Sequence, residues 1–253
     1  MIQFFRRIRH QLLSENLPER NGSVRAGKFS KYILYAIGEI ILVVLGILIA
    51  LQINNWNEIR KLKGIEIKTL RELRSDLTQS MIDIKNDQEY FRFTRKSTLY
   101  ILDHFENPQP YNDSLSYHFA NMYPFSTFSI NRTTFDNLRQ SGANIITNDS
   151  LRIEISNFYT SYINLYKEIE KRSVIEHDEH YIKPMRIKEF SSYSNNSLIV
   201  RDYKMFIANP DNQQILNYSL YIFDNLISYQ GNIIKVIQEL IEQIDKEVAL
   251  YEK

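Results

Sequence analysis

The run EHDEH places side chains that bind metal ions close together. His177 and His180 are three residues apart, and Glu176 lies four residues before His180. Residues three and four apart share a face of an α-helix, so these three side chains could ligate one ion. A catalytic zinc site needs three protein ligands with supporting hydrogen bonds, and no other histidine belongs to a matching motif. We therefore expect a charged, solvated helix face, predict no metal site, and keep His177, His180 and Glu176 as weak metal candidates.

Composition removes several other chemistries. The chain has no cysteine, which excludes disulfides, thiolate catalysis and cysteine-ligated metals. Its seven glycines are scattered, whereas phosphate-binding loops, dinucleotide fingerprints and nucleophile elbows need clustered glycines. The net charge is +1, with basic and acidic residues interleaved, so we expect no nucleic-acid partner. We predict a protein that is not an enzyme and that binds no cofactor.

The strongest signal is an apolar run over residues 32–53. Fourteen of its 22 residues are Leu, Ile or Val, and Glu39 is its single charge. A helix of this length spans about 33 Å, enough to cross a hydrocarbon core of about 30 Å. The apolar residues favour insertion by about 6 kcal/mol, and one carboxylate opposes it by about 3 kcal/mol. We predict an uncleaved signal anchor, because the run is longer than a signal peptide's apolar region and no small-residue cleavage pattern follows it.

One face of this helix stands out. Glu39, Val43, Gly46 and Ala50 share it, and Gly46 and Ala50 form a small-x-x-x-small pair that permits close helix approach. Ionisable residues inside a membrane usually face protein and are functional. We predict that this face contacts another transmembrane helix, through self-association or another membrane protein. The alternative is a tolerated glutamate that leans toward the lipid headgroups.

Charge predicts the topology. The tail over residues 1–31 is rich in Arg and Lys, as is the flank after residue 59. Short tails follow the positive-inside rule better than long domains do. We therefore expect a basic cytoplasmic tail at 1–31, a transmembrane helix at 32–53 and an extracytoplasmic domain at 54–253, in the inner membrane of the cell.

The residues after the anchor are predicted to form helices. A first helix runs to about Glu106, with a stripe at Leu70, Leu73, Leu77, Met81, Ile84, Phe91, Thr98 and Leu102. Short helices are expected at 114–123 and 131–141. A longer one, capped by Asp149 or Ser150, should end before Pro184, with a stripe at Leu151, Ile155, Phe158, Tyr162, Leu165 and Ile169. Residues 185–209 lack periodicity, and the polar run at 191–197 is expected to be an exposed, mobile loop.

The last helix has the cleanest pattern. It opens at Asn209-Pro210, and its stripe repeats every seven residues: Leu216, Leu220, Phe223, Ile227, Gln230, Ile234, Ile237, Ile241, Ile244, Val248 and Tyr251. A seven-residue repeat favours coiled-coil packing against another long helix. We predict an all-α protein with a single transmembrane helix followed by an elongated antiparallel helical bundle, in which no strand is needed.

Two stretches resemble a known family. The sequence KYILYAIGEIILVVLGILIALQINNWNE, with FFRRIRHQLLSEN before it, resembles the amino-terminal signature of a membrane protein family of Bacteroidota whose domain has no known function. TTFDNLRQSGANIITNDSLRIEISNFY resembles the family's second recurring stretch. The resemblance implies a single-pass inner-membrane protein with a helical periplasmic domain, and it brings no catalytic residues.

These observations favour a non-enzymatic envelope scaffold that assembles through its transmembrane face and long helices. The alternative is an extracytoplasmic sensory or small-ligand-binding module, because helical bundles can bind small molecules between their helices. The lipid bilayer is the first partner that the sequence predicts.

Overall fold

The computed structural model describes residues 25–123, 129–142, 145–194 and 196–251. The protein is all-α, as predicted, apart from two short strands. The chain divides into two compact units, Met1–Arg60 and Lys61–Lys253. Most of the predicted basic tail at 1–31 lies outside the described residues.

The first long helix, α2, extends over Arg25–Glu106 and contains the apolar run. Among the described residues, it is the one helix that is long and apolar enough to cross a membrane. Its most apolar stretch has a mean hydropathy of 2.7 and no buried residue. Gly64 lies inside the helix, and α2 ends before Asn107-Pro108, as the sequence predicted.

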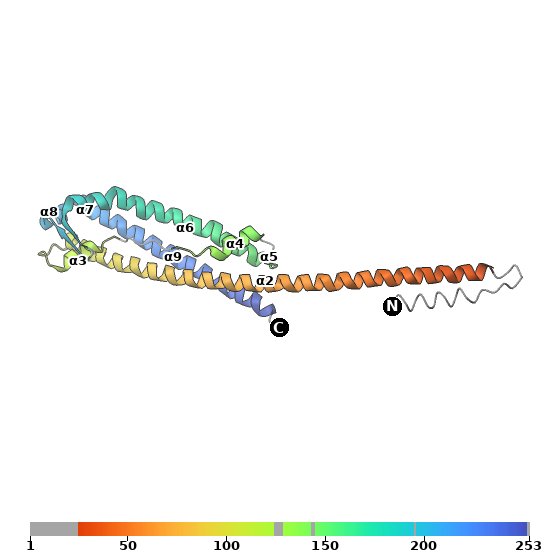
Figure 1. Cartoon of the computed structure of the whole chain (residues 1–253). Helices are drawn as coiled ribbons and strands as arrows, with labels where there is room; N and C mark the ends of the chain where they lie inside the picture. Colours follow the sequence, from red (N-terminus) through yellow and green to blue (C-terminus); the bar gives the residue numbers. More distant parts are fainter. Residues whose placement is uncertain (1–24, 124–128, 143–144, 195, 252–253) are drawn as a thin grey trace. The chain divides into compact units, whose positions relative to one another are not determined.

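In the second unit, α2 pairs with the last helix, α9 (Pro210–Tyr251) (Figure 1). The two run antiparallel, because partners that lie later in α2 lie earlier in α9. Arg74 pairs with Asp245 at 2.6 Å, and Arg95 pairs with Asp224 at 2.6 Å. Of the stripe predicted for α2, Met81 is partly buried and the other members are buried.

The stripe of α9 is wider than predicted. Its fully buried members recur every seven residues, and the intervening ones, such as Leu220 and Ile227, are only partly buried. Leu226 and Leu240, which the stripe omitted, are buried instead. The reason is that α9 packs against two long helical segments rather than one.

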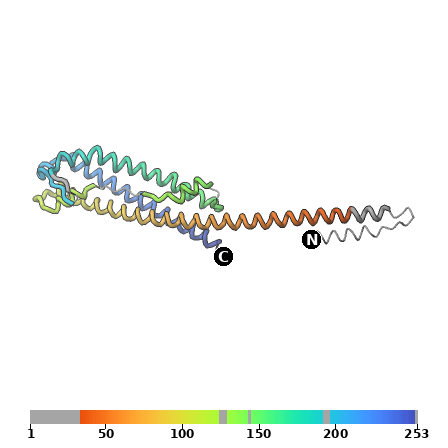
Figure 2. Tube along the Cα trace, in the orientation of Figure 1, coloured from red at the N-terminus to blue at the C-terminus, as the bar shows by residue number. Residues whose placement is uncertain are grey.

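The third long segment covers residues 149–189 and is called the rod below. It consists of α5 (Asp149–Asn157), η2 (Phe158–Tyr162), α6 (Ile163–Glu170), η3 (Lys171–Ile175), η4 (Asp178–Ile182) and α7 (Lys183–Glu189). The η elements are π-helical turns, in which each hydrogen bond spans five residues. The rod runs antiparallel to α9, since Tyr166 contacts Gln230 and His177 contacts Ser219. Figure 2 shows the chain running in one direction along the rod and back in the other along α9.

The stripe predicted for the rod is wrong directly after Phe158, although its last member, Ile169, is partly buried against the core. Tyr162 and Leu165 are exposed, whereas the residues one position later, Ile163 and Tyr166, are buried. The physical reason is η2, because a π-helical turn holds about one residue more than an α-helical turn. The extra residue moves the buried face forward by one position.

The predicted end of this helix is also wrong. The rod continues past Pro184 to Glu189, with Pro184 at the start of α7, directly after η4. Proline lacks an N–H and is tolerated at the start of a helical segment. The cap at the other end is Asn148, whose side chain accepts from the Leu151 N–H, rather than Asp149 or Ser150.

The short helices α3 (Ser114–Ala120) and α4 (Thr133–Ser141) lie close to the predicted positions. Gly142 follows α4 with a φ of +100°, a conformation that favours glycine. Asp76 of α2 holds the start of α4, accepting hydrogen bonds from the Thr134 N–H at 3.1 Å and the Asn131 amide at 2.8 Å.

The segment predicted as a mobile loop is structured. Strands β1 (Phe190–Ser194) and β2 (Ser197–Val200) form an antiparallel hairpin, followed by α8 (Tyr203–Ala208). The rings of Phe119, Phe190 and Phe206 meet with centroid distances of 5.0 to 5.6 Å. This small aromatic core fixes the hairpin, so the prediction that no strand is needed was wrong here.

Candidate functional site

The predicted transmembrane face lies on α2. A helical rotation of 100° per residue places Glu39, Val43, Gly46 and Ala50 within an arc of about 60°. Every side chain over residues 33–56 is exposed in the described part of the chain. A Cβ atom added at Gly46 would meet no atom within 4 Å.

The weak metal candidates do not converge. His177 is buried, with 4% of its surface exposed, whereas His180 and Glu176 are exposed. Within the described ranges, no group of three or more His, Asp or Glu residues is placed to hold a metal ion. The expectation of a solvated face was wrong for His177, because the rod's π-helical turns bring it onto the buried face.

The hydrogen bonds of His177 define its protonation. The Ser219 hydroxyl donates to the Ile215 carbonyl at 2.9 Å, so its oxygen accepts from His177 Nε2, also at 2.9 Å. This assigns the proton of the neutral ring to Nε2. Burial lowers the pKa of His177 to about 4, and the neighbouring Asp178 opposes that shift only in part. His177 is therefore a neutral core histidine at physiological pH.

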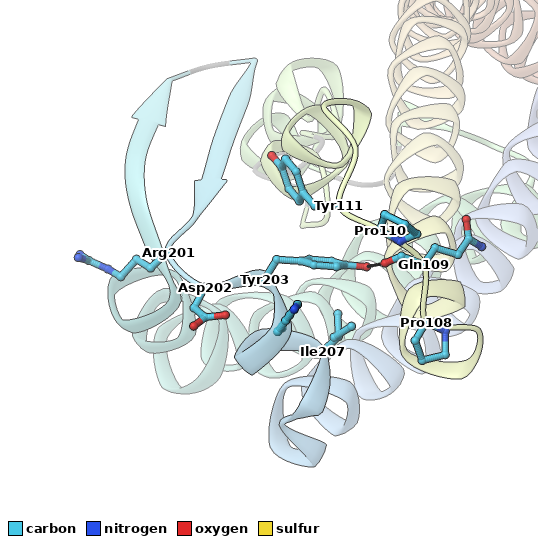
Figure 3. A pocket seen from close by; sticks show the side chains of 9 residues that line it. Pro108, Gln109, Pro110, Tyr111, Arg201, Asp202, Tyr203 and Ile207 are labelled. Carbon is cyan, nitrogen blue, oxygen red and sulfur yellow. Dashed lines mark hydrogen bonds between the residues drawn. The ribbon is translucent and has the colours of Figure 1, made fainter.

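A cleft of about 730 Å³ opens at the end of the second unit where α2 meets α8 (Figure 3). The connection after α2 forms one wall and the start of α8 forms the other, and the lining combines two tyrosines and two prolines with polar and charged residues. Its residues are Pro108, Gln109, Pro110, Tyr111, Arg201, Asp202, Tyr203, Lys204 and Ile207. The side chain of Arg201 points away from the Tyr203 ring.

Tyr203 is held at the centre of this cleft by two hydrogen bonds. Its hydroxyl donates to the Gln109 carbonyl at 2.9 Å, so it accepts from His104 Nδ1 at 2.7 Å. The Tyr111 ring makes an edge contact with the Tyr203 ring at 5.5 Å. Burial raises the pKa of Tyr203, with a smaller contribution from Tyr100. The hydroxyl therefore stays protonated at neutral pH, which suits binding rather than proton abstraction.

A second histidine lies beside this network. His118 stacks on the Tyr100 ring at 4.1 Å, and its Nδ1 lies 3.2 Å from the Ser97 hydroxyl. Burial lowers the pKa of His118, and His104 lowers it further. Both histidines are therefore parts of an aromatic cluster that supports the cleft.

The sequence did not predict this cleft. Its aromatic residues, Tyr111 and Tyr203, belong to segments far apart in the chain, and neither segment has helical periodicity. The available signals were the Pro108-x-Pro110 turn and the start of α8, where Asp202 accepts from the Met205 N–H. Neither signal links the two walls.

Comparison with known proteins gives a match to a family model. No curated protein and no solved structure matches the chain. The family of unknown function DUF6090 matches residues 39–192, from Glu39 in the apolar helix to Ser192 in β1. That range covers more than half of the chain, and so the protein belongs to the DUF6090 family.

Proposed function

We propose that the protein is a non-enzymatic, membrane-anchored helical scaffold of the cell envelope, and that it assembles through its apolar helix. One observation carries the proposal. Glu39 is the single charged residue over residues 33–53, where every side chain is exposed.

A carboxyl group at such a position favours a partner. In a bilayer it costs roughly 3 kcal/mol near the helix centre, and a neighbouring helix that offers a hydrogen bond reduces this cost. Gly46 and Ala50 on the same face allow two backbones to approach closely. The open space around Gly46 supports contact with another chain, because packing within the described chain does not require a glycine there.

We propose a single pass through the inner membrane, with the amino terminus in the cytoplasm and the second unit in the periplasm. The basic residues before the span support this orientation. We also propose that this envelope belongs to a member of the Bacteroidota. That proposal is supported by the amino-terminal resemblance and not by the family match, which begins only at Glu39.

The absence of cysteine allows a direct test in the full chain. Ala50→Cys places a thiol on the Glu39 face, and Leu48→Cys places one on the opposite face. In native membranes under mild oxidation, we expect a disulfide-linked dimer for Ala50→Cys and little for Leu48→Cys. Equal yields for both variants would contradict self-association through this face. A recurrent crosslink to a different protein would identify that protein as the helix partner instead.

The cleft favours a second candidate, a small-ligand-binding module. Its 730 Å³ volume falls in the range of ligand sites, and Tyr111 and Tyr203 offer aromatic rings beside the polar groups of its lining. Native mass spectrometry of the purified full chain tests this candidate. A bound molecule that is lost in Ile207→Arg, but kept in Ile199→Arg on the exposed side of β2, would support it. Identical spectra for the wild type and both variants would contradict it.

A further inference from the structure

Four polar side chains meet in the core of the second unit, midway along its three long helical segments. Asp87 comes from α2, Tyr166 and Glu170 come from α6, and Gln230 comes from α9. None of them exposes more than 6% of its surface. This group is called the core acid cluster below.

Hydrogen bonds join the cluster into a chain. The Gln230 amide donates to Asp87 Oδ2 at 2.7 Å and to the Tyr166 hydroxyl at 3.0 Å. The Tyr166 hydroxyl in turn donates to Glu170 Oε1 at 3.3 Å. An amide nitrogen has two hydrogens and a tyrosine hydroxyl has one, so all of these donors are used. A carboxyl group accepts at each end of the chain.

The groups around Glu170 supply little positive charge to offset a negative charge on Glu170 in addition to one on Asp87. Asp87 faces it from α2, and the neutral Gln230 amide joins the cluster from α9. Lys167, on its own helix, is exposed and acts weakly. Within the described ranges, Glu170 forms no salt bridge, and ionising two acids in one apolar interior is costly.

We propose that the core acid cluster is a proton-binding site that couples the packing of α6 against α2 and α9 to the surrounding pH. With a proton on Glu170, the cluster holds a single negative charge and the three helices pack closely. When that proton leaves, two negative charges face each other in the core and α6 loosens. The site depends on contacts within the second unit and does not require assembly in the membrane.

The electrostatics of Glu170 agree with this arrangement. Burial and then the neighbouring Asp87 raise its pKa to about 7, and the Tyr166 hydrogen bond and Lys167 each oppose that shift to a smaller extent. The pKa of Tyr166 is raised as well, chiefly by burial, so Tyr166 remains a donor over the whole transition. Glu170 is therefore a group in the cluster that changes charge near neutral pH.

Hydrogen exchange measured by mass spectrometry on the full chain in detergent tests the proposal. Amide protection in α6 is compared at pH 6 and pH 8 after correction for the intrinsic exchange rate. We expect wild-type protection to fall by roughly tenfold or more, since one pKa unit is a tenfold change in an equilibrium. Glu170→Gln should keep its protection, because it cannot ionise. Glu168→Gln, an exposed neighbour paired with Arg172, should behave as the wild type does.

A second variant covers the case in which Glu170→Gln does not fold. Asp87→Asn removes the neighbouring negative charge, so an ionised Glu170 faces no second carboxylate and the loss of protection between pH 6 and pH 8 should become smaller. Carboxyl carbon NMR with labelled glutamate reads the same group directly, with an expected midpoint near 7. Identical protection profiles for the wild type and Glu170→Gln, or a Glu170 midpoint near that of free glutamate, would overturn the proposal.

Discussion

Tyr251 at the end of α9 donates a hydrogen bond of 3.0 Å to Glu66 in α2, across 185 residues of sequence. The same buried carboxylate accepts from the Thr147 N–H at 2.6 Å, just before the rod begins. One side chain thus fastens all three long segments at one end of the second unit. These hydrogen bonds explain how Glu66, with 1% of its surface exposed, is tolerated in the core.

Loss of this carboxylate should destabilise the second unit. Glu66→Ala leaves the Thr147 N–H without its acceptor and removes an acceptor of the Thr147 and Tyr251 hydroxyls, which should lower the free energy of unfolding by about 2–4 kcal/mol. Tyr251→Phe removes the hydroxyl's hydrogen bonds with Glu66 and Thr147 but keeps both partners paired with each other, and it should cost about 1 kcal/mol. Denaturant unfolding of the full chain in mild detergent, followed by circular dichroism, measures both. Glu72→Ala, at an exposed salt bridge, is the control and should change little. A Glu66→Ala effect no larger than the control would refute the fastening role.

The position of the π-helical turn η2 lets us predict how single-residue deletions in the rod change thermal stability. Removing the exposed Tyr162 would convert η2 into α-helix and keep Phe158 and Ile163 on the buried face. Removing the exposed Leu165 from α6 would instead leave η2 in place and rotate the following residue, Tyr166, away from the buried face. We expect the second deletion to lower the thermal unfolding midpoint more than the first. Equal losses would mean that η2 does not set the phase of the rod.

Because the pKa of His177 is lowered in the folded protein, we predict that the protein loses stability in acid. Its pKa is about 4 in the folded protein and near 6.5 when unfolded, so the unfolded state binds more protons between these values. The stabilisation is complete above pH 6.5 and is lost as the pH falls toward 4. Allowing for solvent screening, the loss should be about 1–2 kcal/mol. His177→Gln should remove this pH dependence, measured as the difference in unfolding midpoint between variant and wild type across pH 4–7.

Ionisation of Glu170 in the core acid cluster changes the stability of the protein in the opposite direction over the same pH range. The pKa of Glu170 is higher when folded than when unfolded, so its contribution to stability is lost as the pH rises toward 7. The two effects partly cancel in the wild type. A double variant, His177→Gln with Glu170→Gln, should show the flattest stability profile over pH 4–7. A profile as steep as that of either single variant would contradict this assignment.

Sequence periodicity predicted α2 and α9 because nothing interrupts their seven-residue repeat. Leu216, Phe223 and Ile237 are fully buried, as expected for one continuous face. The buried face of the rod was harder to predict, because the amino-acid composition does not indicate where a π-helical turn occurs. Hydrophobic residues such as Tyr162 and Leu165 fit an ideal α-helical stripe and yet are exposed.

The hairpin and the cleft could not be read from local patterns. Ser-rich residues before Asn195 have loop composition, and their pairing depends on contacts of Phe190 with Phe119 and Phe206. Gln230 and Asp87 form a polar pair in the core, although Gln230 occupies an otherwise apolar stripe. Such pairs become visible only when distant helices are placed together.

The most direct test of the scaffold proposal is chemical crosslinking in native membranes, with affinity purification and mass spectrometry, comparing the wild type with Glu39→Gln. Glu58→Gln, after the apolar run, serves as the matched control. We predict a self-crosslink or a recurrent membrane partner that is present in the wild type and Glu58→Gln and is lost in Glu39→Gln. The same crosslinked species at equal yield in all three samples, or none in any, would contradict assembly through the Glu39 face.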